Sequence, residues 1–595
     1  MAIVKLKKLT LCGLKAEKTE VLKKLQLLGG THLISLNQLH FSSETATQKH
    51  TDKVLHALKY LNQCANKRHQ TNDKNSFNLG GIVEQVLNVK QKIRELSDQR
   101  DFLINRIEEV TPWGDFSLLD AAEIGGIKSW FYIIPKGLMK KLQNELIYQV
   151  VYEDNIHCYV VVLAESEPPA NSVPVPRTHT GSIPLSELNK NLQSVELALE
   201  DSQAERESLT RWITLITLSL ADYEDNAMLK VASSLTLDQQ ALFAIQAWVA
   251  ADQVAIFEMF ATDNGLALLI EEVVEQDAPP TLLRNPDMLA GGEELIQFYQ
   301  TPAYNSWDPS IVVFFSFAFF FAMILSDAGY SAVFAMILAF KWNKLGKSIQ
   351  GTRLRMLAAI TLSFSLIWGV LTGGYFGYSP QAESIAGLFK ILDLNDFDSM
   401  MTLSITVGVV HIVLANLIKA YQLKGRRTAL AALAWVFLVV GGFLLWLSLE
   451  GTLYIAYALL AVGGLLLLFF SSERQMSKPI DYLWQLFDGL KSMTGITKIF
   501  GDILSYMRLF ALGLASASLA LTFNQLAEQV YSSVTGLGLL LSILILIIGH
   551  SLNLILCLMS GVVHGLRLNF IEFYSWSVSD EGYAFKMFAK KRKLD

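Results

Sequence analysis

The sequence has few of the residue patterns that carry covalent or metal chemistry. It contains no HExxH motif and no nucleophile elbow. Gly346–Ser348 resembles the end of a phosphate loop, but Lys341 stands where the first glycine is needed and no strand precedes it. Cysteine is scarce, and none of the four residues has disulfide or zinc spacing: Cys12, Cys64, Cys158 and Cys557. We therefore expect no metal, no cofactor and no covalent catalysis by this chain.

The N-terminus also lacks the apolar core of a signal peptide, reading MAIVKLKKLTLCGLKAEKTE. The scattered cysteines fit a reducing cytosol, so we expect the first half of the chain to stay in the cytoplasm. The net charge of −6 over 595 residues gives no sign of a nucleic-acid partner.

The composition divides the chain into two parts. A hydrophobic content of 52% is too high for an ordinary soluble protein, whereas 17% charged residues is too many for a bare membrane bundle. Most of the charge lies in the first half and the long apolar runs lie in the second. We predict a cytoplasmic arm over residues 1–305 and a membrane domain over residues 306–595.

The arm is predicted to be α+β lobes joined by a long antiparallel coiled coil. Strand and helix patterns alternate over 3–36, 130–163 and 233–275. Between these lobes lie two heptad runs, Val86–Ile107, interrupted by Arg100, and Leu185–Leu199. Their length exceeds that of an average helix, which favours a rod over the alternative of two ordinary amphipathic helices.

The second half is predicted to be an all-α polytopic membrane domain. Its apolar segments are Ile311–Phe340, Met356–Phe376, Met401–Tyr421, Leu430–Leu449, Leu453–Phe470, Ile499–Phe523 and Val534–Tyr574. The last two segments are long, and the final one must tilt strongly or project, since about 40 residues span about 60 Å.

Loop charges predict the orientation of these segments. Basic residues over 341–355 and 419–427 mark cytoplasmic loops, the acidic loop Ser379–Ser399 lies outside, and Lys590–Lys593 place the C-terminus inside. With a cytoplasmic N-terminal half, Ile311–Phe340 must cross out and back. We therefore split it at Ser326–Gly329, which gives about eight membrane helices.

Gly501–Thr522 is apolar enough to cross a bilayer and contains Arg508. A charge at the middle of a membrane costs between about 2.5 and over 10 kcal/mol, so such residues are rare and usually functional. Helical spacing from Arg508 gives a stripe of small residues where another helix can approach closely: Ala511, Ala515, Ser518 and Thr522.

The last apolar segment carries a polar stripe at helical spacing: His550, Asn553, Cys557, Ser560, His564 and Arg567. From His550 to Arg567 the stripe is about 25 Å long. Polar residues in membrane helices face cavities or partners rather than lipid, so the stripe can line a water-filled path. The alternative for Cys557 and Ser560 is that they join helices by hydrogen bonds.

Several motifs together are similar to the large membrane subunit of the rotary V-type/A-type ATPases, subunit a in eukaryotes and subunit I in prokaryotes. These are GDILSYMRLFALGLASASLA, HGLRLNFIEFYSWS, SDAGY at 326–330, IWGVLTGGYFG at 367–377 and PWGDF at 112–116. The resemblance covers the whole chain. It implies a non-nucleotide-binding stator subunit that couples H⁺ or Na⁺ translocation to ATP hydrolysis or synthesis elsewhere in a complex at the cell membrane.

The resemblance also implies roles for individual residues. Arg508 matches the stator arginine that faces an ion-binding carboxylate on each rotor helix, and Arg567 matches the second arginine of that interface. Half-channels for the ion are then expected to be lined by polar residues near both arginines: Ser505, His550, Asn553, Ser560, His564 and Glu572. The small stripe from Ala511 to Thr522 would face the rotor.

The implied partners are a rotor ring of small membrane subunits, peripheral-stalk subunits bound to the N-terminal arm, a central-stalk subunit beneath the ring, and the lipid membrane. Eukaryotic members carry histidine where this chain has Ser516 and glutamate where it has Cys557, so the lining of the path differs here.

The alternative functions are a stand-alone secondary transporter with a cytoplasmic regulatory domain, and a membrane-anchored scaffold. The sequence has no matching halves of the kind found in many transporters, and a scaffold leaves both membrane arginines unexplained. An internal ion pair that turned Arg508 away from any neighbouring ring would contradict the stator hypothesis.

Overall fold

A computed structural model describes residues 3–36, 44–73, 77–117, 126–142, 146–169, 172–274, 277–381, 383–394, 396–448, 451–472, 479–534, 536–578 and 580–590. The chain forms two compact units. Unit 1 comprises Met1–Gly13, Gly30–Ile34 and Ala244–Met587, and unit 2 comprises Leu14–Gly29, Ser35–Phe243 and Phe588–Asp595. Of the predicted basic C-terminal segment, residues 591–593 lie outside the described residues.

The N-terminal part of unit 1 is an α/β lobe. Its sheet has the order β2-β7-β1-β8, with β1 antiparallel to β8 and β2 antiparallel to β7. The strands are β1 (Leu6–Leu14), β2 (Thr31–Ile34), β7 (Leu242–Ala250) and β8 (Ala267–Glu272). Leu9 and Leu11 of β1 are buried on one face of the strand, and α6 (Val254–Asp263) buries Phe257. The predicted strands of this lobe are therefore present.

Unit 2 is mainly helical and carries a small sheet. Its helices are α1 (Lys18–Leu28), α2 (Glu44–Asn62), α3 (Leu79–Val110), α4 (Leu185–Leu209) and α5 (Ile213–Leu235). The sheet has the order β3-β5-β4, with bounds β3 (Lys128–Pro135), β4 (Tyr148–Glu153) and β5 (His157–Ala164). Both strand pairs are antiparallel, and Val160 and Val162 on the central strand are fully buried.

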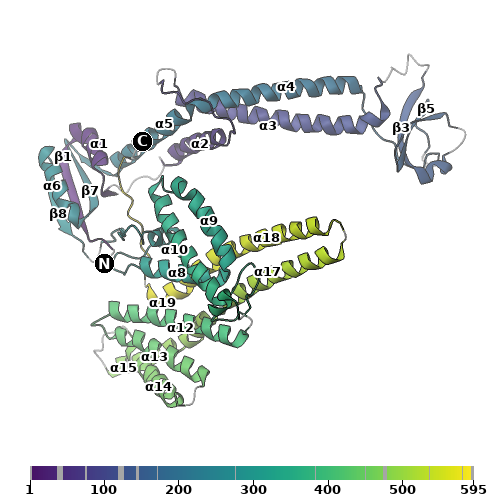
Figure 1. Ribbon diagram of the computed structural model, residues 1–595. Helices are drawn as coiled ribbons and strands as arrows, with labels where there is room; N and C mark the ends of the chain where they lie inside the picture. The colour runs from purple at the N-terminus through teal and green to yellow at the C-terminus, as the bar shows by residue number, and fades with distance from the viewer. Residues whose placement is uncertain are drawn as a thin grey trace. The chain divides into compact units, whose positions relative to one another are not determined.

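Helices α3 and α4 form an antiparallel pair (Figure 1). Asn78 caps α3 by accepting a hydrogen bond from the amide of Gly81, and Pro184 precedes α4. Their apolar seam buries Leu103 of the first predicted heptad run and Leu188 and Val195 of the second. Val110, just beyond the first run, is buried with them. The heptads therefore predict which faces meet, while coiled-coil packing of this pair stays a prediction.

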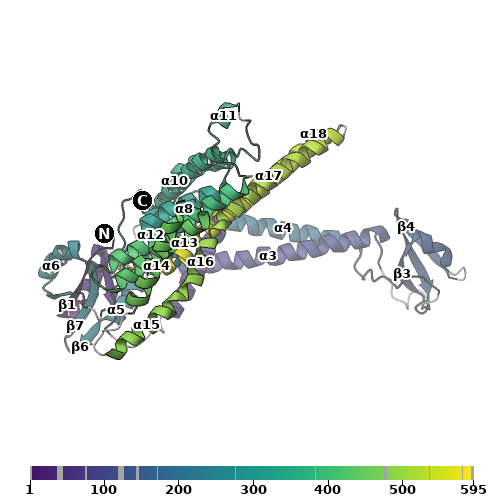
Figure 2. The same ribbon diagram turned by 90° about the horizontal axis from the view of Figure 1, so that it is seen from below.

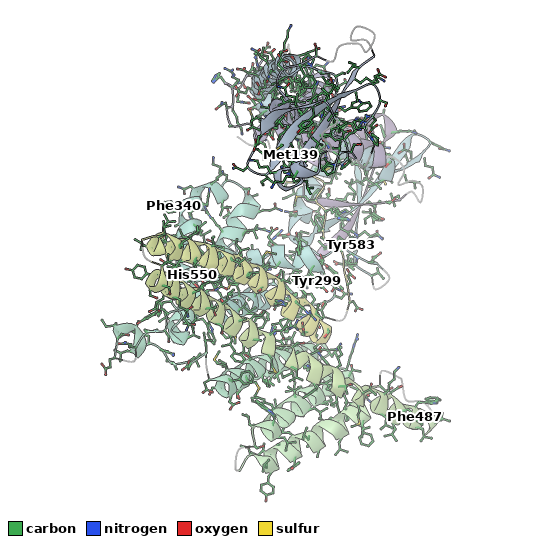
Figure 3. The ribbon with its side chains drawn as sticks, turned by 90° about the vertical axis from the view of Figure 1, so that its right-hand side faces the viewer. Met139, Tyr299, Phe340, Phe487, His550 and Tyr583 are labelled. Carbon is green, nitrogen blue, oxygen red and sulfur yellow. The ribbon has the colours of Figure 1, made fainter. Side chains whose placement is uncertain are left out.

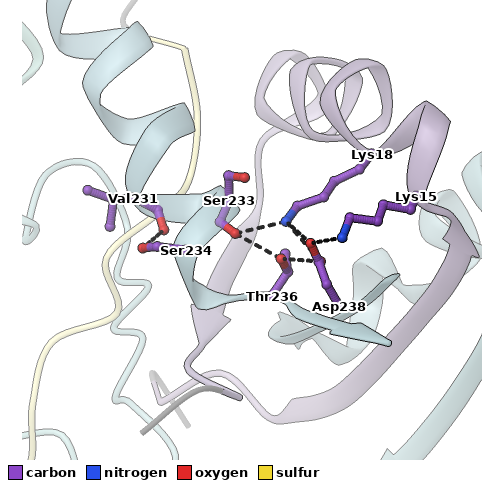
Figure 4. Close-up of polar contacts among 7 residues, drawn as sticks. All are labelled: Lys15, Lys18, Val231, Ser233, Ser234, Thr236 and Asp238. Atoms are coloured by element: carbon purple, nitrogen blue, oxygen red, sulfur yellow. Dashed lines mark hydrogen bonds and ion pairs between the residues drawn. The ribbon is translucent and has the colours of Figure 1, made fainter. Parts of the chain in front are cut away.

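The start of α1 is tied to the end of α5 by a lysine (Figure 4). Lys18 Nζ donates to the carbonyl of Ser233 at 3.0 Å and to Asp238 Oδ1 at 2.9 Å. Lys15 Nζ lies 3.5 Å from Asp238 Oδ2. Burial opposes ionisation of Asp238, but its hydrogen bond and charge pairing with Lys18 lower its pKa overall.

The remainder of unit 1 is helical. Six helices among the described residues are long and apolar enough to cross a membrane: Ile349–Thr372, Phe397–Gln422, Thr428–Leu447, Leu453–Phe470, Leu483–Ser533 and Gly538–Ser577.

The individual helices of this part of unit 1 follow in chain order: α7 (Gly291–Tyr299), α8 (Ser310–Leu325), α9 (Ala328–Leu345), α10 (Ile349–Thr372), α11 (Ile385–Leu388), α12 (Phe397–Gln422), α13 (Thr428–Leu447), α14 (Leu453–Phe470), α15 (Pro479–Met493), α16 (Gly495–Leu504), α17 (Met507–Ser533), α18 (Gly538–Arg567) and α19 (Tyr574–Ser577).

The apolar segment Ile311–Phe340 is divided where the sequence predicts. Helix α8 ends at Leu325, and the next residue, Ser326, has a left-handed backbone. Asp327 then caps α9 by accepting from the amide of Tyr330 at 2.9 Å. Both halves pack against α10. The division is therefore present, while a total of eight membrane-crossing helices stays a prediction.

The last two long helices, α17 and α18, run side by side (Figures 1 and 2). Helix α17 follows α16 after a break at Ser505–Tyr506. Helix α18 continues through a π-helical turn, Leu568–Phe573, into α19, so the helical run Gly538–Ser577 has 40 residues. This length matches the predicted final segment, and its tilt in a membrane stays a prediction.

Candidate functional site

Arg508 lies in the first turn of α17, just after the break at Ser505–Tyr506. Its Nε donates to the carbonyl of Ser505 at 3.0 Å, and its Nη2 donates to Glu572 Oε1 at 2.8 Å. The Arg508 side chain keeps 25% of its surface exposed, whereas the Glu572 side chain keeps 3%. The guanidinium is thus ion-paired on its inner side and open on its outer side.

Glu572 reaches Arg508 from the π-helical turn that follows α18. A π turn makes i→i+5 hydrogen bonds, which changes the face on which the following side chains lie, and such turns are frequent at functional sites. Glu572 Oε2 is buried and has no hydrogen-bond partner among the described residues. A buried carboxylate with a single charged partner depends on that partner, because removal of one member of such a pair costs about 3–5 kcal/mol.

A surface hollow of about 720 Å³ lies on the outer side of Arg508. Arg567 lines the same hollow, together with Ser505 and Ala511, whereas Glu572 does not line it. The remaining lining residues are mostly apolar: Phe397, Gly501, Leu504, Met507, Phe510 and Leu514. Two permanent positive charges, 59 positions apart in the sequence, therefore meet at one apolar opening.

The residues beside Glu572 fix the π turn to the rest of the bundle. Phe573 is fully buried and stacks on His411 of α12 with ring centroids 4.3 Å apart. His411 Nδ1 lies 2.8 Å from the hydroxyl of buried Tyr506. Trp576 Nε1 donates to Asp502 Oδ2 at 2.7 Å. Aromatic packing and hydrogen bonds thus hold both ends of the ion pair.

The predicted stripe of small residues lies on the outer surface of α17. Ala511, Ala515, Ser518 and Thr522 are all exposed. Buried residues of the same helix lie on the opposite face, where Gly513 meets the carbonyl of Met323 in α8. The stripe beside Arg508 therefore has no covering element in the described part of this chain, and small side chains there leave room for a foreign helix.

A second polar group lies further along α18, and we call it the polar cluster: Tyr330, Ser516, Asn524, His550, Asn553 and Cys557. His550 lies between the Tyr330 hydroxyl, 2.7 Å from Nδ1, and Asn524 Oδ1, 3.0 Å from Nε2. Asn553 Nδ2 donates to the Tyr330 hydroxyl at 3.1 Å and to the Ser516 carbonyl at 3.0 Å. Figure 3 labels His550 on α18.

Cys557 extends this cluster toward the arginines. Its Sγ lies 2.8 Å from Ser516 Oγ and donates to Asn553 Oδ1 at 3.5 Å. The two positions at which the sequence departs from the eukaryotic pattern, Ser516 and Cys557, therefore contact each other. A hydroxyl and a thiol form a neutral pair here, so this part of the cluster carries no charge.

Hydrogen bonds do not connect the predicted polar stripe on α18 along its whole length. His550, Asn553 and Cys557 belong to the polar cluster, and Arg567 lines the hollow. Ser560 and His564 are half-buried between these two groups, and no hydrogen bond within the described residues links them to either. His564 Nδ1 is buried without a partner there. Ser505 and Glu572 belong to the arginine site, not to the polar cluster.

Two participants, Tyr330 and Asn524, were not identifiable as site residues from sequence spacing, and neither was the ion pair of Arg508. Tyr330 lies in the SDAGY motif, whose distinctiveness was the only signal for it. Asn524 lies beyond the small stripe and gave no signal. The pairing of Glu572 with Arg508 depends on the π turn, which no periodic pattern marks. No group of three or more His, Cys, Asp or Glu side chains in the described ranges is placed to hold a metal.

Comparison with known proteins finds relatives that share the name ATP synthase subunit I. V-type ATP synthase subunit I of Chlamydia pneumoniae is 27% identical over 584 residues, with 85% of each chain covered. The protein of the same name from Borreliella burgdorferi is 25% identical over 99% of this chain and all of its own length. A-type ATP synthase subunit I of Methanocaldococcus jannaschii is 25% identical over 68% of this chain and 64% of its own.

No protein-family profile matches the sequence. A solved cytoplasmic N-terminal domain of subunit I, homolog of subunit a, of V-ATPase aligns with 44% of this chain at 15% identity, with a TM-score of 0.20, too low to indicate a shared fold. The sequence matches extend over most of this chain and most of its bacterial relatives. The chain is a homologue of subunit I of the V-type and A-type ATP synthases.

Proposed function

We propose that this chain is the stator membrane subunit of a V/A-type rotary ATPase. In this role it forms, with a rotor ring of small membrane subunits, the two half-channels through which H⁺ or Na⁺ passes. It binds no nucleotide itself and couples ion passage to ATP hydrolysis or synthesis in other subunits. The relatives named ATP synthase subunit I support this assignment.

The observation that carries the proposal is the hollow lined by both arginines. A carboxylate in lipid prefers to be protonated or ion-bound, because desolvation raises its pKa. A guanidinium stays charged even when buried, so it stabilises the ionised form of a carboxylate that enters the hollow and drives the bound ion off. Arg508 also repels a cation that would pass directly from one half-channel to the other.

The exposed small stripe supports the same geometry. Ala511, Ala515, Ser518 and Thr522 continue outward from the hollow along α17, where a rotor helix would pack. The carboxylate on each rotor helix would then pass Arg508 at close range as the ring turns.

The half-channels are assigned to polar residues on either side of this contact. His550 and Asn553, in the polar cluster, line one path, and Ser560 and His564 extend it toward Arg567. Ser505 and Glu572 belong to the other end, next to Arg508. Hydrogen bonds join the cluster in the structure, and water would have to connect Ser560 and His564 to it.

The rest of the chain anchors this membrane site. Residues 1–305 form a cytoplasmic stator arm that receives peripheral stalks, and residues 306–595 form the translocation domain, with the C-terminus also cytoplasmic. A central-stalk subunit lies beneath the ring. The helix pair α3–α4 gives the arm an extended element on which stalks can be held.

Gentle-detergent purification of the tagged chain from its native membrane tests this proposal. Co-isolation with a ring of small carboxylate-bearing membrane subunits and a nucleotide-binding head, together with ATP-driven ion uptake in sodium-free or sodium-containing buffer, supports it. A monomer that transports a solute alone would replace it with the secondary-transporter alternative.

A further inference from the structure

We propose that Glu572 is the resident counter-ion of Arg508. It is a positioning residue that keeps the guanidinium paired and aimed at the hollow while no rotor carboxylate is opposite. This inference rests on the proposed function and concerns how the arginine releases each carboxylate, which the presence of Arg508 alone does not explain.

The contacts of Arg508 divide between two sides. Nε and Nη2 are used on the inner side by the Ser505 carbonyl and Glu572. Nη1 has no hydrogen-bond partner among the described residues, and the side chain lines the hollow. A guanidinium has five N–H donors in a planar fork, so it can hold one carboxylate from the inside and receive a second from the hollow.

The Glu572 carboxylate is held in place, whereas the second carboxylate, on a rotor helix, would move. The Glu572 side chain is 3% exposed and does not line the hollow. Its neighbour Phe573 stacks on His411, and one turn on, Trp576 is hydrogen-bonded to Asp502 of α16. The Glu572 carboxylate therefore cannot follow a rotor helix, and it stays with the arginine between successive encounters.

An anion that stays beside Arg508 weakens the attraction between this arginine and the carboxylate of a passing rotor helix. An unpaired guanidinium in a low-dielectric site attracts a passing carboxylate strongly and slows its departure. With Glu572 beside it, Arg508 presents a reduced net charge to the hollow, and the rotor carboxylate leaves more readily. The same pair prevents Arg508 from standing as an uncompensated charge when the opening is empty.

The test uses the assembled complex in liposomes with the variants Glu572→Gln and Glu572→Asp. Glutamine keeps the size and a hydrogen-bond acceptor but removes the charge. We expect ATP-driven transport and coupled ATP hydrolysis to fall together by about tenfold in Glu572→Gln, since a charged hydrogen bond is lost. Glu572→Asp should recover much of this loss, and Glu528→Gln, on the exposed surface of α17, should match the parent.

Parent-like turnover in assembled Glu572→Gln would overturn the inference, and so would loss of transport with unchanged ATP hydrolysis, which indicates a leak. If Glu572→Gln does not assemble, the smaller neutral variant Glu572→Ala decides: a matched fall in both rates supports the inference, and parent rates refute it. Arg508→Ala separates the two proposals. If Arg508→Ala transports like the parent, the proposed function fails; if it is inactive while Glu572→Gln is normal, only the counter-ion role fails.

Discussion

At the scale of single residues, Arg508 is held from two directions. An internal ion pair with Glu572 occupies its inner side, and a hollow shared with Arg567 opens on its outer side. A stator role would be contradicted by an internal ion pair that also turned the guanidinium away from any partner surface. The internal pair is present, but the guanidinium is not turned away, because Arg508 remains 25% exposed and lines the hollow.

The positive charge of the arginine site was predictable from the sequence, whereas the ion pair between Arg508 and Glu572 was not. The high cost of a guanidinium in lipid singles out Arg508 and Arg567 without any structure. Helical spacing also brings His550, Asn553 and Cys557 to one face. The partner of Arg508 depends on a π turn, and the link to Tyr330 depends on hydrogen bonds from the start of α9 to α18. Neither leaves a periodic signal.

Tyr330→Phe tests the polar cluster. The change removes the hydroxyl that contacts both His550 and Asn553 while the ring keeps its edge-on contact with Phe376. Loss of a buried hydrogen-bond partner costs about 1–3 kcal/mol, so we expect ATP-driven transport to fall several-fold in a complex that still assembles. Tyr378→Phe is the control, since Tyr378 is 62% exposed. Equal transport in both variants would remove the cluster from the ion path.

At the scale of elements, close helix crossings at glycine shape the bundle. A Cβ at Gly369 of α10 would lie 2.7 Å from the Cα of Ala328, at the start of α9. Backbone atoms cannot move aside as a flexible side chain can. The crossing therefore holds the division between α8 and α9 in place.

Gly369→Ala should destabilise the purified chain by about 1–3 kcal/mol, because overpacking at a backbone contact forces the helices apart. Gly442→Ala is the matched control, since nothing lies within 4 Å of its added Cβ. This control should be neutral or stabilising by up to about 1 kcal/mol. Thermal unfolding in detergent measures both, and equal melting temperatures would contradict the close crossing.

The C-terminal strap, residues 580–587, returns to the N-terminal lobe of unit 1. It forms isolated bridges from Ala584 to Thr281 and from Glu581 to Pro302. The amide of Lys586 donates to His32 Nδ1 at 2.8 Å, which requires that nitrogen to be unprotonated. Burial and the nearby Lys586 charge lower the pKa of His32 from its ordinary value of 6.5.

Acidification should therefore loosen the strap. Below pH 6.5 the detached state binds a proton on His32 that the attached state resists, so attachment weakens as pH falls toward the lowered pKa. We expect the exchange protection factor of the Lys586 amide to be smaller at about pH 5.5 than at about pH 7.5. His32→Gln should remove this difference, and a difference of equal size in that variant would exclude His32 as its cause.

Periodicity predicted the elements better than their contacts. The two heptad runs lie on the facing sides of α3 and α4, and acidic capping at Asp327 marks the division of the first apolar segment. The strap was not predictable, because short isolated bridges carry no repeating apolar pattern.

At the scale of the whole molecule, the charges of the loops predict its orientation. A cysteine at Gln381, in the loop between α10 and α12, should react with an impermeant maleimide added outside intact cells. A cysteine at Lys424, between α12 and α13, should react only after the membrane is opened. Both variants need Cys12 and Cys64 replaced by serine, since these native thiols are half-buried rather than buried. The reverse labelling pattern would invert the proposed topology.

The most direct test of the central claim is ATP-driven ion transport by the assembled complex carrying Arg508→Lys. Lysine keeps a positive charge in water but can lose its proton in a buried site, and it cannot hold two carboxylates in one planar fork. The account predicts a complex of normal composition whose transport falls at least tenfold. Transport at the parent rate in that complex would contradict the account, because a permanent guanidinium charge at position 508 would then not be required.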